Sequence, residues 1–181
     1  MNKTVFIFRH GETDWNKRKI IQGHTDIPLN ETGQAQAHLL GEKLANKGIE
    51  LIMSSDLQRA ALTATIVASY TNCPITYHQD LREFHAGELQ STCSETLTKQ
   101  NPHWRQLLIN NPIYDNHAFP GGETKAAARA RTAAMIAACL QAPQQCIALS
   151  SHGIAIALML EALIGHDPHE FVLGSVEFSK K

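Results

Sequence analysis

Four basic side chains stand just after short apolar segments, at positions where they could act on an anion. They are Arg9, His10, Arg59 and His152. A guanidinium group offers a planar fork of N–H donors that matches phosphate oxygens, and a neutral imidazole is a nucleophile toward phosphorus. Neighbouring arginines favour that neutral form. The same cations would repel a metal ion, so the set predicts a phosphate pocket and no metal site.

Transfer of a phosphoryl group also needs a proton donor for the leaving oxygen. Glu83 is the candidate, and the residues alone leave Glu88 as an alternative. The acid would have to be protonated near neutral pH, which burial or a neighbouring phosphate promotes. Taken singly, each basic residue is better explained as a helix cap or the partner of a surface carboxylate. Their shared place after apolar segments favours a functional site.

The elements that must position these residues alternate between short apolar runs and longer helical patterns, which is typical of an α/β fold. We expect strands at residues 4–8, 51–53, 74–77, 146–149 and 175–178. We expect helices at residues 32–47, 57–70, 94–110 and 123–141, and after Gly153 to about Ile164, with Ser54–Asp56 capping the second. The result is a three-layer αβα sandwich with a mostly parallel sheet, whose strand ends share one ligand-binding edge.

Composition limits the class of protein. The 181 residues predict a single domain over residues 1–181. A formal net charge of -1 disfavours binding to a nucleic-acid backbone. Four cysteines without a CxxC pair, no secretory segment and no membrane-length apolar run predict a cytoplasmic protein without a membrane partner. No pattern indicates an oligomeric interface. Six histidines without a motif are expected to be exposed: His24, His38, His78, His85, His103 and His117.

Five blocks in order, covering residues 8 to about 178, resemble the motifs of the histidine phosphatase (phosphoglycerate-mutase-like) superfamily, in its small phosphatase branch. They are Phe8-Arg9-His10-Gly11-Glu12-Thr13 continuing through Asn16, Gln22-Gly23 and Gly33; Ser54-Ser55-Asp56-Leu57-Gln58-Arg59-Ala60; Leu81-Arg82-Glu83 with Gly87; Pro120-Gly121-Gly122-Glu123-Thr124; and Ser151-His152-Gly153. One Arg-His-Gly alone is weak evidence, whereas five blocks in one order are specific.

The resemblance implies a role for each matching residue. His10 attacks phosphorus and becomes phosphohistidine, and Glu83 protonates the leaving oxygen and then activates water. Arg9, Arg59 and His152 hold the phosphoryl oxygens. Further pocket residues are Asn16, Gln22, Gly23 and Gly153. No metal or organic cofactor is implied, and the partners are a small phosphorylated substrate and the product phosphate.

Three functions are compatible with these residues. A phosphomonoesterase is favoured, because residues 84–119 leave little room for a lid that would shield a phosphohistidine from water. A phosphoglycerate-mutase-type phosphotransferase is the second. A non-catalytic phosphate-binding module is the third, but binding alone would not need His10, Glu83 and His152 together.

The identity of the substrate depends on residues 84–119, which carry no readable motif. The sequence is equally compatible with contacts to the leaving group from Arg105, Tyr114 or His117 and with exposure of these side chains to solvent. Sugar phosphates, phosphoglycerates, α-ribazole phosphate and protein phosphohistidine are the alternatives. The chain departs from the family pattern after Gly87, where Glu88-Leu89-Gln90-Ser91 follows. It ends at Lys181, so we expect the family's C-terminal tail to be short or truncated.

Overall fold

A sheet of five strands forms the centre of the structure, a computed structural model that describes residues 3–100, 115–164 and 176–180. The strands are β1 (Lys3–Arg9), β2 (Leu51–Ser55), β3 (Ile75–His78), β4 (Cys146–Ser151) and β5 (Val176–Lys180). They stand in the order β3-β2-β4-β1-β5, and all neighbours are parallel except β5, which is antiparallel to β1. The carboxyl ends of β1, β4 and β2 therefore meet at one edge.

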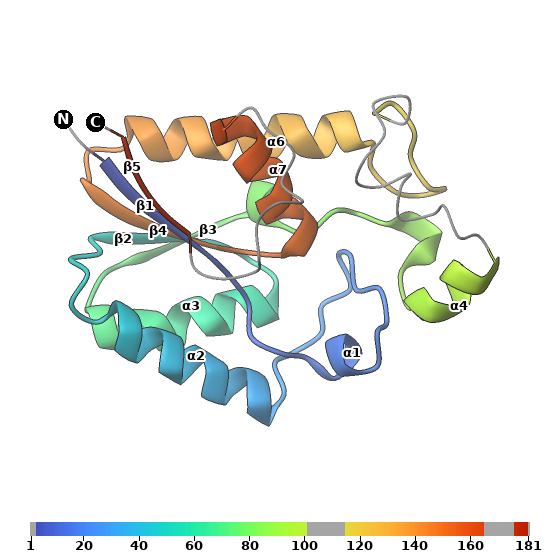
Figure 1. Cartoon of the computed structure of the whole chain (residues 1–181), viewed down its shortest axis with the longest axis horizontal. Coiled ribbons are helices and arrows are strands. Elements are labelled where there is room, and N and C mark those ends of the chain that lie inside the picture. Colours follow the sequence, from blue (N-terminus) through green and yellow to red (C-terminus); the bar gives the residue numbers. More distant parts are fainter. Residues whose placement is uncertain (1–2, 101–114, 165–175, 181) are drawn as a thin grey trace.

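Helices cover both faces of the sheet (Figure 1), which confirms the expected αβα sandwich. One face carries α2 (Glu31–Leu44) and α3 (Gln58–Thr71), and the other carries α6 (Lys125–Gln141) and α7 (Gly153–Ile164). The shorter elements are α1 (Asp14–Lys17), α4 (Ser94–Gln100) and the 3-10 turns η1 (Gln79–Leu81) and η2 (Gly87–Leu89). The start of β1 and the end of β5 lie side by side (Figure 1), because Lys3 is paired with Lys180.

Side chains of β1 alternate between two hydrophobic cores, as the pleat of a strand requires. Val5 and Ile7 pack in the core that includes α6 and α7 residues, whereas Phe6 and Phe8 pack in the core with α2 and α3. All four side chains are buried. A strand buried on both faces reads as a continuous apolar run, which is why β1 is visible in the sequence.

The start of α3 differs from the sequence-based expectation. Residues 54–55 belong to β2, and Leu57 occupies the N-cap without a side-chain hydrogen bond to the helix. The expected cap by Ser54–Asp56 is therefore wrong. The Gln58 N–H instead donates to the Asp26 carboxylate, at 2.7 Å. A cap supplied from a distant loop leaves no signal in the local sequence.

The helix expected at residues 94–110 is described only as α4, Ser94–Gln100. Trp104, Leu107 and Leu108, which were expected to lie on its continuation, fall outside the described residues, as do Arg105 and Tyr114. His117 is described and is exposed.

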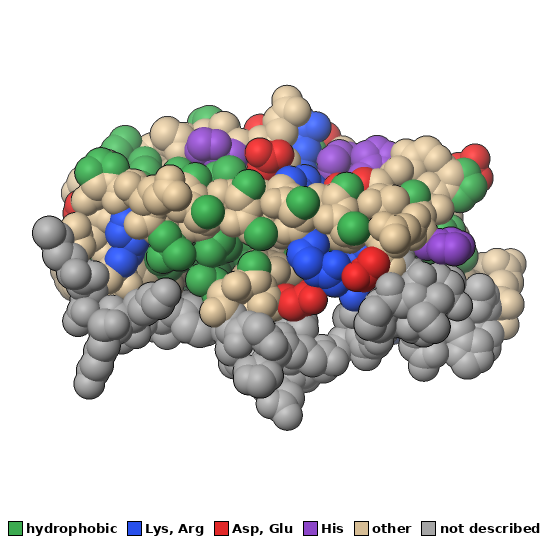
Figure 2. All heavy atoms as spheres, turned by 90° about the horizontal axis from the view of Figure 1, so that it is seen from above, with side chains coloured by type: hydrophobic (Ala, Val, Ile, Leu, Met, Phe, Trp, Pro, Cys, Tyr) green, Lys and Arg blue, Asp and Glu red, His purple; other side chains and the backbone are tan. Residues whose placement is uncertain are grey.

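The face covered by α6 carries basic and acidic side chains next to one another (Figure 2). Arg129 pairs there with Asp115 and with Glu161 of α7. At the other end of α6, the Lys3 ammonium donates to the carbonyls of Cys139 and Ala142, which stabilises the helix C-terminus. Among the described helices, none is long and apolar enough to cross a membrane.

Candidate active site

The parallel register of β1 and β4 brings two histidines together. Arg9 lies opposite Ser151, and the His10 N–H donates to the Ser151 carbonyl at 3.1 Å. The next residue in each chain segment is a histidine, so the rings of His10 and His152 come within 5.1 Å of each other, centre to centre. Both rings are buried. The site thus begins at the edge where ligands bind in parallel sheets.

The His10 ring is held in one tautomer. Its Nδ1 lies 2.7 Å from the Gly11 carbonyl oxygen, which can only accept, so Nδ1 carries the proton. The lone pair is therefore on Nε2. Burial, with the charges of Arg9 and Arg59, lowers the pKa of His10 to about 3. The ring is neutral at physiological pH and its Nε2 is a nucleophile.

The His152 ring is held in the opposite tautomer. The Arg59 Nε–H donates to Nδ1 at 3.2 Å, so the proton of this ring is on Nε2. That proton is donated to the Ser55 hydroxyl at 2.9 Å. Burial and the Arg59 charge lower the pKa of His152 well below its usual value. In this arrangement the ring has no free N–H, and it would donate to a phosphoryl oxygen only in exchange for Ser55. Ser55 was not among the site residues predicted from the sequence.

Arg59 is fully buried at the start of α3. Besides His152, its guanidinium donates to the carbonyls of Gly23 and Thr25, at 2.8 and 2.9 Å. A guanidinium has five N–H donors, so three such bonds leave two N–H groups for another acceptor. Gly23 has a φ of +51°, and a Cβ there would come within 2.2 Å of the Gln90 side chain, so glycine is strongly favoured at this position.

Arg9 and Glu83 both lie close to Gly153. A Cβ built on Gly153 would be 3.6 Å from Glu83 Oε2 and 3.7 Å from Arg9 Cζ. The Arg9 guanidinium makes no hydrogen bond or ion pair with any residue that the structure describes, and its side chain is exposed. Gly153 therefore keeps open a space that is bordered by a free cation and a carboxyl oxygen.

The Glu83 carboxyl group caps the N-terminus of α7 from outside the helix. Its Oε1 accepts the N–H groups of Phe84, Ile154 and Ala155, at 2.9 to 3.1 Å. The partial positive charge at the N-terminus of α7 also attracts the Glu83 carboxyl oxygens. Oε1 is saturated with donors, whereas Oε2 has only the longer contact to the Ile154 N–H, at 3.3 Å. Oε2, the oxygen nearer to Gly153, therefore has room for a further hydrogen bond.

The loop after β1 is tied down by close backbone packing. A Cβ on Gly11 would come within 2.2 Å of the Gly33 carbonyl oxygen, so only glycine fits at this crossing of the loop and α2. Thr13 and Asn16 form a capping box around α1. Because the Asn16 Oδ1 accepts from Thr13, its NH2 group is turned away from that bond.

Gln22 is the remaining sequence-predicted pocket residue. The residue is 8% exposed, and its Oε1 is the one buried side-chain oxygen or nitrogen in the described ranges that has no hydrogen-bond partner. A buried amide oxygen without a donor costs free energy.

The expectation of exposure is wrong for three of the unassigned histidines: His78 at the end of β3 is partly buried, and so are two that lie beside the acid. His24 and His85 are both partly buried, and their rings lie 4.5 Å apart, centre to centre. The His24 Nε2–H donates to the Glu83 carbonyl at 2.7 Å. Glu88, the alternative acid, is exposed. His103, like His166 and His169 farther on, lies outside the described residues.

Comparisons with known proteins agree with one another. Residues 5–176 match the family described as the histidine phosphatase superfamily (branch 1). The probable phosphoglycerate mutase GpmB of Citrobacter koseri is 39% identical over 162 residues, 89% of this chain and 74% of that protein. A solved mycobacterial structure, Mycobacterial hydrolase 1, has a TM-score of 0.86 with 26% identity, covering 99% of this chain and 91% of its own.

Two further structures carry phosphatase names. A mycobacterial glucosyl-3-phosphoglycerate phosphatase in complex with VO3 has a TM-score of 0.79 with 29% identity, covering 91% of this chain and 81% of its own. A putative alpha-ribazole-5'-P phosphatase from Escherichia coli has a TM-score of 0.77 with 26% identity, covering 92% of this chain and 82% of its own.

Proposed function

The chain belongs to the histidine phosphatase superfamily, and from that premise we propose that it is a phosphomonoesterase that hydrolyses a small phosphorylated metabolite through a phosphohistidine on His10. Membership and the named neighbours support a phosphatase or a mutase. The observation that carries the proposal is the state of His10: a neutral ring with its lone pair on Nε2, beside two guanidinium groups.

The first chemical step transfers the phosphoryl group to the enzyme. The His10 Nε2 attacks phosphorus, a P–N bond forms, and the P–O bond to the leaving group breaks. The Glu83 Oε2 gives its proton to the leaving oxygen, which departs as an alcohol. Negative charge that develops on the phosphoryl oxygens is stabilised by Arg9 and by the two N–H groups of Arg59 that are not already bonded.

The second step returns the enzyme to its starting state. Glu83, now a carboxylate, takes a proton from water while the water oxygen attacks phosphorus. The P–N bond breaks, inorganic phosphate leaves, and the lone pair returns to Nε2. We assign the Asn16 and Gln22 amide groups to the bound phosphoryl group, Gly23 and Gly153 to the space around it, and His152 to a phosphoryl oxygen in exchange for Ser55.

The test is covalent labelling of His10. We expect phosphate release from p-nitrophenyl phosphate in the presence of EDTA, and an acid-labile phosphoenzyme after rapid quenching. Both should be lost in His10→Ala. His38→Ala is the matched control, because His38 is exposed on α2 and bonds only to Tyr70 among the described residues. Phosphate release that persists in His10→Ala would refute the mechanism.

A phosphoglycerate mutase is the second candidate, because the curated relatives carry that name. The two activities differ in the acceptor of the phosphoryl group, which is water in one and a second hydroxyl in the other. A phosphoglycerate with a bisphosphorylated primer separates them. Isomer formation faster than phosphate release would overturn the phosphatase proposal in favour of the mutase.

A further inference from the structure

The segment that carries Glu83 is held by its backbone. Four consecutive carbonyl groups, those of residues 80 to 83, each accept a hydrogen bond from a side chain that is distant in sequence. Ser151 at the end of β4 donates to the second of them, at 2.7 Å. The other three accept from Arg131 of α6. One side chain therefore binds three of the four carbonyls, and the Arg82 side chain adds a separate anchor through its two bonds to Asp56.

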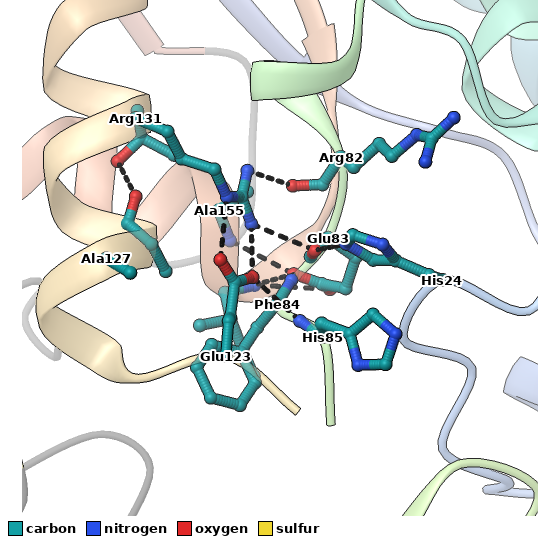
Figure 3. Close-up of polar contacts among 12 residues, drawn as sticks. His24, Arg82, Glu83, Phe84, His85, Glu123, Ala127, Arg131 and Ala155 are labelled. Atoms are coloured by element: carbon teal, nitrogen blue, oxygen red, sulfur yellow. Dashed lines mark hydrogen bonds and ion pairs between the residues drawn. The ribbon is translucent and has the colours of Figure 1, made fainter. Parts of the chain in front are cut away.

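The Arg131 guanidinium reaches these carbonyls because Glu123 fixes its orientation (Figure 3). Arg131 Nε and Nη2 donate to the two carboxylate oxygens of Glu123, at 2.9 and 2.6 Å. Nη1 then donates to the carbonyls of Asp80 and Arg82, at 2.8 and 2.7 Å, and Nη2 to that of Glu83, at 3.0 Å.

Glu123 holds the segment at a second point. Its Oε1 also accepts the backbone N–H of His85, at 2.8 Å. Burial alone would raise the pKa of Glu123, but the hydrogen bonds from Arg131 and from His85 lower it overall, so this carboxylate stays charged. The ion pair is mostly buried, with 15% and 17% of the two side chains exposed. Two parallel hydrogen bonds between a guanidinium and a carboxylate fix the orientation of the two side chains relative to each other.

We propose that Arg131 and Glu123 are positioning residues for Glu83: they hold residues 80–85 so that the Glu83 carboxyl group stays at the N-terminus of α7 with Oε2 facing the leaving group. The proposal rests on the proposed function, because it takes Glu83 as the general acid. Neither residue touches the space beside Gly153 in any contact of the described chain. They act through the backbone of residues 80–85.

The nucleophilic side of the site is held mostly by other contacts, and one link joins the two sides: His24, between Gly23 and Thr25, donates to the Glu83 carbonyl. Gly11 fixes His10, and the carbonyls of Gly23 and Thr25 fix Arg59. Loosening residues 80–85 should therefore impair protonation of the leaving group and leave phosphoryl binding and attack largely intact. A general acid contributes about 10²- to 10⁴-fold, and only where the leaving oxygen needs a proton.

The experiment compares two substrates in each variant. An alkyl phosphate needs the acid, whereas 2,4-dinitrophenyl phosphate releases a stable phenolate without it. Arg131→Lys removes the fork but keeps the charge, and Glu123→Gln keeps the shape but removes the charge. Arg129→Lys is the matched control on the same helix, since Arg129 makes comparable ion pairs with Asp115 and Glu161 and none with residues 80–85. The ratio of kcat/KM for the two substrates does not depend on the fraction of folded protein.

We expect Arg131→Lys and Glu123→Gln to lower kcat/KM for the alkyl phosphate by about 10-fold or more and for the dinitrophenyl ester by less than about 3-fold. Arg129→Lys should leave the ratio unchanged. Equal losses on both substrates, or no loss, would overturn the positioning role. Glu83→Gln separates the two hypotheses: if it lowers both substrates equally, the acid role in the proposed function fails, whereas a selective loss in Glu83→Gln alone refutes only the inference about Arg131 and Glu123.

Discussion

The neutral, buried state of His10 has a measurable consequence for stability against pH. In the folded protein its pKa is about 3, whereas an imidazole in the unfolded chain has a pKa near 6.5. Between these values the unfolded state binds a proton that the folded state does not. The free energy of unfolding therefore falls as the pH falls below about 6.5. Replacing His10 by glutamine, which does not titrate, removes this dependence.

The size of the effect follows from the same two values. At pH 5 nearly every unfolded chain carries the proton and almost no folded chain does, so His10 alone destabilises the folded state by about 2 kcal/mol relative to pH 7.5. At pH 3 the loss approaches about 4 to 5 kcal/mol, an upper range because partial opening of the site would relieve it. His152 acts in the same direction and is present in both proteins.

Urea unfolding followed by circular dichroism at pH 7.5, 6 and 5 measures this loss in the wild type and in His10→Gln. We expect the wild type to lose about 2 kcal/mol more than His10→Gln between pH 7.5 and pH 5. A constant offset between the two proteins would reflect packing of the new side chain and leave the argument intact. Equal pH dependence would refute it, because His10 would then titrate alike in the folded and unfolded states.

Three further substitutions test single contacts. Gly11→Ala should lower the free energy of unfolding by more than about 3 kcal/mol in urea unfolding, because the new methyl group would collide with the Gly33 carbonyl. Gly153→Ala should fold normally and lower kcat/KM for any phosphate ester by about 10-fold or more, because its methyl group fills the space beside Glu83 Oε2; an unchanged kcat/KM would contradict this. Lys3→Met should lower the thermal midpoint by an amount equivalent to about 1 kcal/mol, with activity unchanged, because α6 loses the cation at its C-terminus.

The sheet is predictable because its signal is local. Buried parallel strands are short apolar runs, and β1, β2 and β4 each read that way. The rule that parallel strands share a ligand-binding edge then places the residues after them side by side. His10 and His152 meet in the structure for that reason, although 142 positions separate them in the sequence.

The features of the site that could not be predicted depend on contacts between residues that are far apart in the sequence. In the sequence, Arg131 looks like any other arginine in an alanine-rich helix. Its positioning role depends on its hydrogen bonds to the carbonyl groups of residues 80, 82 and 83. A backbone carbonyl is present at every position, so no residue type marks the four that accept bonds here. The Asp26 cap of α3 and the pairing of His24 with the Glu83 carbonyl escape prediction for the same reason.

In the proposed mechanism Arg59 binds the phosphoryl group, and its partners in the structure leave no ion pair to be broken first. Its three acceptors are two backbone carbonyls and the neutral His152 ring, and none of them carries a charge. No described residue forms an ion pair with it, and burial lowers its pKa only to about 10, so it stays protonated. The carbonyls solvate the guanidinium and fix its direction, and the carboxylates of Glu83 and Asp26 favour its charged form without forming a salt bridge with it among the described residues. In the proposed mechanism, a phosphoryl dianion that enters between Arg59 and Arg9 would meet two cations and displace no carboxylate from Arg59. Burial and the same two charges lower the pKa of His10, so that its ring is neutral for the proposed attack.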